Sequence, residues 1–146
     1  MNRLFNILIF LIGICFASVE SHAFCFQDAG QIYNVPPQLL WTIAKVESDF
    51  NPRSINFRTE TDYDFGLMQI HTSWAKKLGK ETWRSLGNPC QNVKVGAWIL
   101  SRCLQKHGYN WKGIGCYNAV SDAKRIRYAR KVFAVLKKIN NIQDKR

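Results

Sequence analysis

The sequence predicts a single, mainly α-helical domain, and three observations lead to that prediction. Apolar residues recur at spacings of three and four along several segments, which is the periodicity of an amphipathic helix. No segment shows an apolar alternation strong enough to build the core of a sheet. The chain has 146 residues, which is enough for one hydrophobic core and too few for two domains.

Residues 1–23 have the pattern of a signal peptide. Arg3 opens a short positive region, and residues 4–16 are nearly all apolar but too few to span a bilayer comfortably. A Ser-His-Ala tripeptide that ends at Ala23 supplies the small residues expected before a cleavage site. We therefore expect export and a mature domain over residues 24–146. An uncleaved membrane anchor is the alternative.

Two helices are expected next. The second opens at Pro36-Pro37, because proline fits the first turn of a helix. On that helix Leu40 and Ile43 share an apolar stripe, and Glu47 falls on the same stripe one turn later. The helix ends before Pro52, since the residue that precedes a proline leaves the helical conformation. The first helix is indicated by the helical spacing of Phe26, Ala29, Ile32 and Tyr33.

The middle of the chain is more polar. Residues 53–65 contain short alternating stretches, which predict a small β-hairpin or a lid loop near residues 55–65. Thr72 or Ser73 can then cap a short helix that stops near Gly79. The sheet content of the protein is therefore expected to be minor.

Three further helices are expected in the C-terminal half. A long helix runs from Asn88-Pro89 to Gly108, a shorter one is capped by Asn110, and the last begins at Ser121 or Asp122. Their apolar faces predict that they pack on one core. The residues expected to face it are Val93, Ala97, Leu100, Leu104, Trp111, Ile114, Tyr117, Ile126, Ala129, Phe133 and Leu136.

The chain is strongly basic, with 21 Lys and Arg residues against 10 Asp and Glu and a formal charge of +11. Such an excess points to an anionic partner. Nine of the basic residues lie between Lys124 and Arg146. This tail is either the solvated face of an amphipathic helix or an attachment to an anionic wall. Export argues against nucleic acid as the partner, and no membrane span is expected after cleavage.

Four cysteines remain once the signal peptide, which contains Cys15, is removed. An even number in a small exported domain favours disulfides, with free buried thiols as the alternative. Three pairings are open from spacing alone. The sequence has no CxxC motif, and His71 and His107 stand isolated, so we expect no metal and no cofactor. The four cysteines are Cys25, Cys90, Cys103 and Cys116.

Glu47 is the best candidate for chemistry. A carboxylate on an apolar stripe loses hydration in its charged form, which raises its pKa and lets it act as a general acid near neutral pH. The alternative is a glutamate at a helix end that turns to solvent or pairs with an arginine. The nearest candidates for a second catalytic carboxylate are Asp62 and Asp64 in the polar loop. They can equally be solvated loop charges.

Two short runs could bind a ligand. In the run Gly66–Ile70 the glycine allows a close approach of backbone to a ligand, and Gln69 offers both a donor and an acceptor to a sugar. The alternative is a core turn in which Met68 is merely packed. The pair Tyr117 and Asn118 can orient a carboxylate or hold a sugar.

Taken in order and spacing, three motifs resemble the lytic transglycosylases of the soluble-transglycosylase catalytic domain. They are the runs Val46–Pro52 and Gly66–Ile70 and the pair Tyr117-Asn118. The glutamate-serine motif and the Gly-Leu-Met-Gln run are specific together, although neither is specific alone. The resemblance implies a lysozyme-like, mostly helical domain with a sugar-binding cleft.

Further features narrow the resemblance to the specialised peptidoglycan-cleaving enzymes of type III and type IV secretion systems and conjugative plasmids. These features are the small size, the export signal, the placement of Cys25 and Cys90, and the run Gly96–Leu100. The similarity covers roughly residues 25–134. It implies a disulfide between Cys25 and Cys90, a periplasmic location, and a secretion or conjugation apparatus protein as partner.

The resemblance also implies roles for individual residues. Glu47 matches the single catalytic acid, and its neighbour Ser48 matches a residue that supports or orients it. The residues that would line the cleft beside the scissile bond, or bond near the glutamate or the sugar, are Gly66, Met68, Gln69, Tyr117 and Asn118.

The chain departs from the family pattern at two positions. Cys116 stands where the family usually has alanine, and a disulfide from Cys116 to Cys103 would account for it. Val120 stands where the family usually has glycine, two residues after Asn118. The second departure concerns the turn after the Tyr-Asn pair and leaves the glutamate unaffected.

The reaction implied is cleavage of the β-1,4 bond between N-acetylmuramic acid and N-acetylglucosamine in peptidoglycan glycan strands, with 1,6-anhydro ends as products. Glu47 would act first as acid and then as base. A lysozyme-type hydrolase would instead use Asp62 or Asp64 to position water. The remaining alternatives are a non-catalytic cationic wall-binding module and a cationic membrane-active protein.

Overall fold

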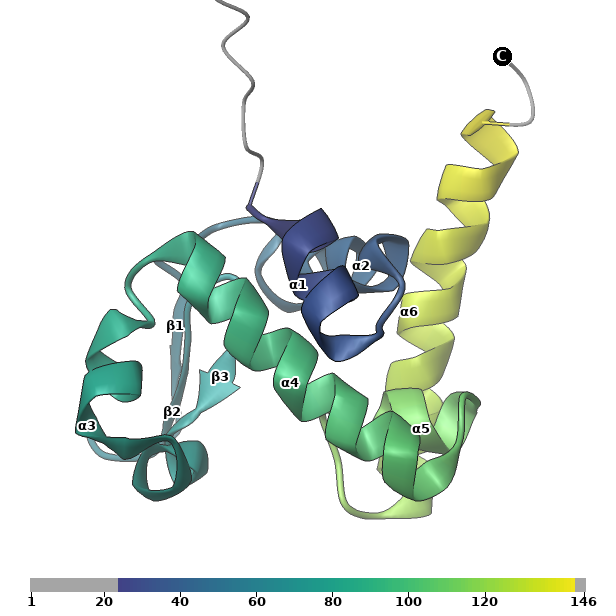
Figure 1. Cartoon of the computed structure of the whole chain (residues 1–146). Coiled ribbons are helices and arrows are strands. Elements are labelled where there is room, and N and C mark those ends of the chain that lie inside the picture. The colour runs from purple at the N-terminus through teal and green to yellow at the C-terminus, as the bar shows by residue number, and fades with distance from the viewer. Residues whose placement is uncertain (1–23, 144–146) are drawn as a thin grey trace, which may run out of the picture.

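A computed structural model describes residues 24–143, so the expected signal peptide lies outside the described residues. The predicted mainly α-helical class is confirmed. In Figure 1 helix α4 crosses the middle of the molecule, with the sheet and α3 on one side and α6 on the other. The elements are α1 (Phe26–Tyr33), α2 (Pro37–Ser48), β1 (Ile55–Phe57), β2 (Tyr63–Phe65), β3 (Ile70–His71), the 3₁₀ helix η1 (Thr72–Trp74), α3 (Ala75–Ser85), α4 (Pro89–His107), α5 (Trp111–Cys116) and α6 (Asp122–Gln143).

Helix α2 begins and ends for identifiable local reasons. Pro37 occupies its first turn, and Asp49 follows it in the left-handed conformation (φ 52°), donating its backbone N–H to the carbonyls of Ala44 and Lys45. Ile43 on its inner face is fully buried. Glu47 follows one turn later and is half-buried, so it lies where the core meets the surface.

The predicted hairpin is confirmed, and a third strand extends it. The strands pair in the order β1-β2-β3, all antiparallel. Phe57 pairs with Tyr63, and Asp64 pairs with His71. A two-residue strand such as β3 carries too little alternation to be recognised in the sequence. The sheet brings Asp64 and His71 together at the edge of the core.

Helix α4 packs against α1, α2 and α5 and so connects most of the fold. The predicted start at Asn88-Pro89 and end at Gly108 are confirmed, and Asn88 caps the helix by accepting hydrogen bonds from the N–H groups of Cys90 and Gln91. Gly96 has no side chain because Met68 lies against it: an added Cβ would stand 2.8 Å from the Met68 side chain. Helix α4 therefore packs directly against the turn that contains Met68.

The prediction for the inner face of α6 is wrong at Phe133. The helix buries Tyr128, Ala129 and Val132, whereas Phe133 is 44% exposed and Ile126 is only partly buried. The buried positions follow spacings of one and three, so Phe133 lies about 100° beyond Val132 and off the stripe. The prediction followed Phe133 because it lies four residues after Ala129, whereas the structure buries Val132, three residues after Ala129.

Two smaller expectations also need correction. The helix after Ser73 does break at Gly79 (φ 78°, ψ 162°), but it resumes and continues to Ser85, so α3 is two short helices. Ile32, expected on the apolar stripe of α1, is 59% exposed. Within residues 24–143, no helix combines the length and apolar character needed to cross a bilayer.

Both expected disulfides are present. Cys25 is bonded to Cys90, which ties the start of α1 to the start of α4 across 65 residues. Cys103 is bonded to Cys116, which ties α4 to the end of α5 across 13 residues. The second disulfide directly precedes Tyr117 and fixes the chain that carries it.

Candidate active site

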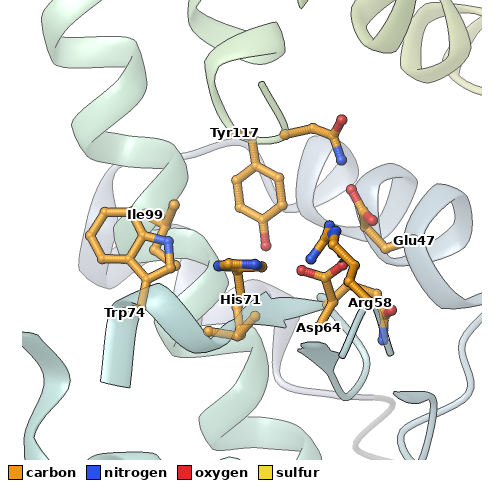
Figure 2. A pocket seen from close by; sticks show the side chains of 10 residues that line it. Glu47, Arg58, Asp64, His71, Trp74, Ile99 and Tyr117 are labelled. Carbon is orange, nitrogen blue, oxygen red and sulfur yellow. Dashed lines mark hydrogen bonds and ion pairs between the residues drawn. The ribbon is translucent and has the colours of Figure 1, made fainter. Parts of the chain in front are cut away.

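Glu47 lines a pocket to which α2, the sheet, α4 and the end of α5 all contribute. Figure 2 shows Glu47, Arg58 and Asp64 on one side of the Tyr117 ring, and Trp74 with Ile99 on the other. Segments far apart in the sequence are thereby brought to one place. The lining residues are Glu47, Arg58, Asp64, Gln69, Ile70, His71, Trp74, Ile99, Tyr117 and Asn118.

The carboxyl group of Glu47 holds its proton unusually well. The pKa of Glu47 is raised from 4.5 to about 7; burial is the largest cause, and the negative charge of Asp64 acts in the same direction. The hydrogen bond from Tyr128 and the positive charge of Lys131 act in the opposite direction and are smaller effects than burial. A large fraction of the molecules therefore carry a protonated Glu47 at neutral pH, as its place on the apolar stripe predicts.

Tyr128 is a site residue that the sequence analysis missed. Its hydroxyl donates a hydrogen bond of 2.6 Å to Oε1 of Glu47, from a position 81 residues later in the chain. The ring is stacked on that of Tyr117, with the centroids 6.4 Å apart. Burial and the Glu47 charge raise the pKa of Tyr128 well above its usual value, so it remains a donor. An aromatic residue within a basic helix gives no signal of this role.

Ser48 directly follows Glu47 in the chain, but it does not line the pocket. Its hydroxyl donates to the carbonyl of Leu67 at 2.8 Å and lies 3.2 Å from the carbonyl of Ala44. The first of these bonds links the end of α2 to the turn before β3. Ser48 thus fixes the position of Glu47 relative to the opposite wall.

The turn before β3 depends on Asn92, a buried residue of α4 that the sequence analysis did not single out. Its Oδ1 accepts the N–H of Met68 at 2.8 Å, and its Nδ2 donates to the carbonyls of Phe65 and Leu86. Gly66 is required beside it: φ is +81°, and an added Cβ would stand 2.1 Å from Nδ2 of Asn92. Gly66 is buried and shapes the turn from behind.

The expected cleft residues divide into lining and supporting positions. The Met68 side chain is fully buried in the core, and only its carbonyl reaches towards the site, accepting the Tyr117 hydroxyl at 2.7 Å. Gln69 lines the pocket, and its Nε2 donates to the carbonyls of Ser54 and Gly66. Asn118 also lines the pocket, beside Tyr117.

The two acids proposed as second carboxylates are placed differently. Asp64 lines the Glu47 pocket and forms an ion pair of 2.8 Å with Arg58. Asp62 is not among the lining residues; it pairs with His71 at 2.6 Å and lies 3.9 Å from Arg58. The structure therefore brings only Asp64 to the side of Glu47.

The pocket offers hydrogen-bonding and aromatic groups that suit a hydroxyl-rich ligand. It opens into a groove along the segment after α5, where Val120, Ser121 and Lys124 join Tyr117 and Asn118. Amide, hydroxyl and aromatic groups on such a surface hydrogen-bond to sugars and stack on them. Within residues 24–143, no three His, Cys, Asp or Glu side chains are grouped so that they could hold a metal ion. Glu47, with its pKa of about 7, is a group in the pocket that can donate a proton near neutral pH.

Comparison with known proteins shows to which family this chain belongs. The model of the family described as "Transglycosylase SLT domain" matches residues 24–139. The chain is 35% identical to the invasion protein IagB of Salmonella typhimurium (strain SL1344), over 97% of this chain and 91% of that protein. It is 32% identical to the protein IpgF of Shigella flexneri, over 82% and 84%.

A third relative is also similar over nearly the whole chain. The chain is 32% identical to a peptidoglycan-binding-like protein of Escherichia coli O157:H7, over 98% of this chain and 92% of that protein. The family match spans all the helices that build the pocket. The chain belongs to the transglycosylase SLT domain family, and it is a lytic transglycosylase that acts on peptidoglycan.

Proposed function

We propose that this enzyme cleaves the β-1,4 bond between N-acetylmuramic acid and N-acetylglucosamine and leaves 1,6-anhydromuramic ends. The observation that carries the proposal is the carboxyl group of Glu47, which lies in a groove and has a pKa of about 7. A group with this pKa can give up a proton and recover it at neutral pH. A single residue can therefore serve both halves of the reaction.

In the first half, protonated Glu47 donates its proton to the glycosidic oxygen. The bond between that oxygen and C1 of the muramyl sugar breaks, and N-acetylglucosamine leaves with a new hydroxyl. The acetamido oxygen on C2 of the muramyl sugar stabilises the positive charge at C1, as in glycosidases that use substrate assistance. General acid catalysis of this kind contributes roughly 10² to 10⁴ in rate.

In the second half, ionised Glu47 takes the proton from the C6 hydroxyl of the muramyl sugar. The C6 oxygen attacks C1, the acetamido oxygen is released, and the 1,6-anhydro ring closes. No water is consumed, and Glu47 ends protonated, ready for the next bond. The charge of Lys131 and the hydroxyl of Tyr128 favour the ionised state that exists between the two halves.

Glu47→Gln tests the assignment. We expect this variant to fold and to release almost no fragments from purified sacculi, because an amide cannot donate the proton. Glu81→Gln, on the exposed surface of α3, is the matched control and should digest sacculi like the wild type. Wild-type rates from Glu47→Gln would contradict the proposal, and they would also contradict the alternative in which the chain is a catalytic hydrolase.

A lysozyme-type hydrolase is the second candidate, and the place of Asp64 in the Glu47 pocket favours it. In that mechanism Asp64 would position or activate a water molecule that attacks C1. The two reactions differ by one water in the mass of the muramyl product, which mass spectrometry of the fragments resolves. Anhydro ends support the transglycosylase route, whereas reducing ends that depend on Asp64 support hydrolysis.

We further propose that the enzyme works in the periplasm, where it opens the wall locally for a secretion or conjugation apparatus. The signal-peptide pattern of residues 1–23 supports export, and the similarity to an invasion protein supports a role in a machine that crosses the envelope. N-terminal sequencing of the protein recovered from the periplasm checks the expected cleavage after Ala23. Recovery of an intact N-terminus in the membrane fraction would overturn it.

A further inference from the structure

A second recess adjoins the Glu47 pocket, and its character is different. Trp74 and Ile99 line both, so the two lie next to each other. Figure 2 shows these two residues on the side of the pocket away from Glu47. We call this second space the cationic recess; its lining residues are Trp74, Lys77, Ile99, Arg102, Cys103, Gln105, Lys106 and Cys116.

Three positive charges line the cationic recess, and none is neutralised within the described residues. Lys77, Arg102 and Lys106 are exposed, and no carboxylate of residues 24–143 forms an ion pair with any of them. The lining contains no acidic residue. Neighbouring like charges repel one another, so an anion bound here would relieve repulsion as well as form ion pairs.

Two of these cations are held in place by aromatic rings. The ring of Trp98 lies 5.4 Å from that of Trp74 in an edge-to-face arrangement. Lys77 Nζ lies 5.5 Å from the Trp74 centroid and 5.6 Å from that of Trp98, and the Arg102 guanidinium lies 5.3 Å from Trp98. Cation–π contacts restrict long side chains that would otherwise be mobile. A ligand therefore loses less entropy when it binds them.

We propose that the cationic recess binds the acidic stem peptide of peptidoglycan while the glycan strand occupies the Glu47 pocket. This inference rests on the proposed function and adds the substrate form that the enzyme prefers. The sugar rings carry no charge, whereas the stem peptide attached to the muramyl lactyl group carries several carboxylates. A recess with three cations next to the pocket therefore suits the acidic peptide better than the uncharged sugar rings.

The preference can be measured on two forms of the same polymer. Glycan that retains its peptides is compared with glycan from which an amidase has removed them, which leaves one carboxylate on each lactyl group. We expect wild-type enzyme to cleave both and to show a KM about fivefold lower for the peptide-bearing form, with kcat unchanged. Two or three exposed ion pairs contribute a difference of this size.

Removal of the cations should abolish the preference. The double variant Lys77→Gln/Arg102→Gln is expected to raise the KM for peptide-bearing glycan about fivefold and to leave that for stripped glycan within about twofold. The double variant Lys137→Gln/Lys138→Gln, on α6, removes the same charge outside the recess and should change neither. Lys77→Arg/Arg102→Lys keeps the charge and should retain the preference.

Direct binding separates this inference from the proposed function. The Glu47→Gln variant, mixed with a disaccharide tetrapeptide, should show NMR shifts at the backbone amides of Lys77 and Arg102. Shifts confined to the Glu47 pocket, equal KM values for both glycans, or an equal effect of the α6 variant would overturn the inference and leave cleavage intact. Failure of wild-type enzyme to cleave either glycan would instead overturn the proposed function.

Discussion

At the scale of single residues, exclusion of water does more to set the protonation of Glu47 than any neighbour does. Burial is the largest influence on its pKa, and the Tyr128 hydroxyl, Asp64 and Lys131 only adjust it. These adjustments have opposite signs, so the pocket holds the carboxyl group between two protonation states. Such a balance suits a group that must release a proton and then recover it.

The rate of cleavage should fall as the pH rises through about 7. Glu47 has to be protonated to attack the glycosidic bond, and its pKa of about 7 sets the point at which half of the molecules lack this proton. The dependence of kcat/KM on pH for soluble glycan fragments measures it. A profile that stays flat from pH of about 5 to about 8 would contradict the assignment.

Stability should change with pH through the same group. The folded-state pKa of Glu47 lies above its unfolded value of 4.5, so the folded chain binds this proton more tightly. The resulting stabilisation is fully present below pH 4.5 and is lost as the pH rises through about 7. Because Gln cannot ionise, Glu47→Gln should gain on the order of 2 to 3 kcal/mol over wild type between pH of about 5 and about 8. Urea unfolding at both pH values measures this, and an unchanged difference would contradict it.

Tyr128→Phe tests the hydrogen bond that the sequence analysis did not find. The bond from the Tyr128 hydroxyl lowers the pKa of Glu47, so its removal should raise that pKa further above 7 and move the alkaline limb of the pH profile upwards. The ring remains, so the packing of α6 is kept. Tyr33→Phe removes the same hydroxyl from a residue that does not line the Glu47 pocket, so this control should leave the profile in place. An unmoved profile in Tyr128→Phe would show that the contact has no part in catalysis.

What the sequence could predict at this scale depended on local spacing. Glu47 was identifiable because it continues an apolar stripe set by Ile43 and Leu40, four and seven positions earlier. Tyr128 and Asn92 act across 81 and 24 residues, to Glu47 and Met68 respectively, and no local pattern reports such contacts. Met68 was expected in the cleft on the strength of a motif, but its side chain packs in the core and its carbonyl supports Tyr117.

At the scale of elements, the turn between β2 and β3 connects the sheet to α4. The hydroxyls of Ser48 and Tyr117 donate hydrogen bonds to carbonyl groups of this turn, and Asn92 accepts a hydrogen bond from one of its N–H groups. The turn thus has bonds to α2, to α4 and to the end of α5. A displacement of this turn would move both walls of the pocket.

Gly66→Ala should destabilise the protein by about 2 kcal/mol or more and strongly reduce activity. An alanine here requires a positive φ and drives its Cβ into the Asn92 amide, so both strain and a broken buried hydrogen bond contribute. Chemical denaturation and sacculus digestion measure the two effects.

Gly79→Ala and Gly87→Ala are the controls for Gly66→Ala. Gly79 has φ +78° with open space around it, so its variant should show only the cost of strain, about 1 kcal/mol. Gly87 also has open space, without a positive φ, and should be almost neutral. Equal losses at Gly66 and Gly79 would mean that the contact with Asn92 contributes nothing.

Elements were predictable where their signals were local. The pair Asn88-Pro89 and the cap Asn110 marked the starts of α4 and α5, and in the structure both Asn side chains accept the first free N–H groups of their helix. The inner face of α6 was wrong at Phe133, and β3 was missed. Both depend on which surface the rest of the fold presents, which periodicity in one segment does not reveal.

At the scale of the whole molecule, the two disulfides hold different parts of the fold. The bond between Cys25 and Cys90 closes a long loop and secures the N-terminal helix, whereas that between Cys103 and Cys116 closes a short loop next to Tyr117. The pairing was open from spacing alone and came from the family resemblance. Their effects on stability and activity should therefore differ.

Removal of the long-range disulfide should cost more stability, and removal of the short one should cost more activity. Cys25→Ser/Cys90→Ser is expected to lower the free energy of unfolding by about 4 kcal/mol, and Cys103→Ser/Cys116→Ser by about 3 kcal/mol, because the longer loop restricts the unfolded chain more. Urea unfolding measures both. Digestion of sacculi at a temperature at which both variants are folded should be slower for the second pair; the reverse order would contradict the prediction.

The position of Cys116 also links the support of Tyr117 to the oxidation state of the chain. Its bond to Cys103 directly precedes Tyr117, the ring stacked on the tyrosine that contacts Glu47. A newly made chain among the reducing thiols of the cytosol lacks this support, and it gains it only in an oxidising compartment. If the enzyme is exported as we propose, the bond between Cys103 and Cys116 would form only after the chain has left the cytosol, and the support of Tyr117 would then be the last part of the site to be completed.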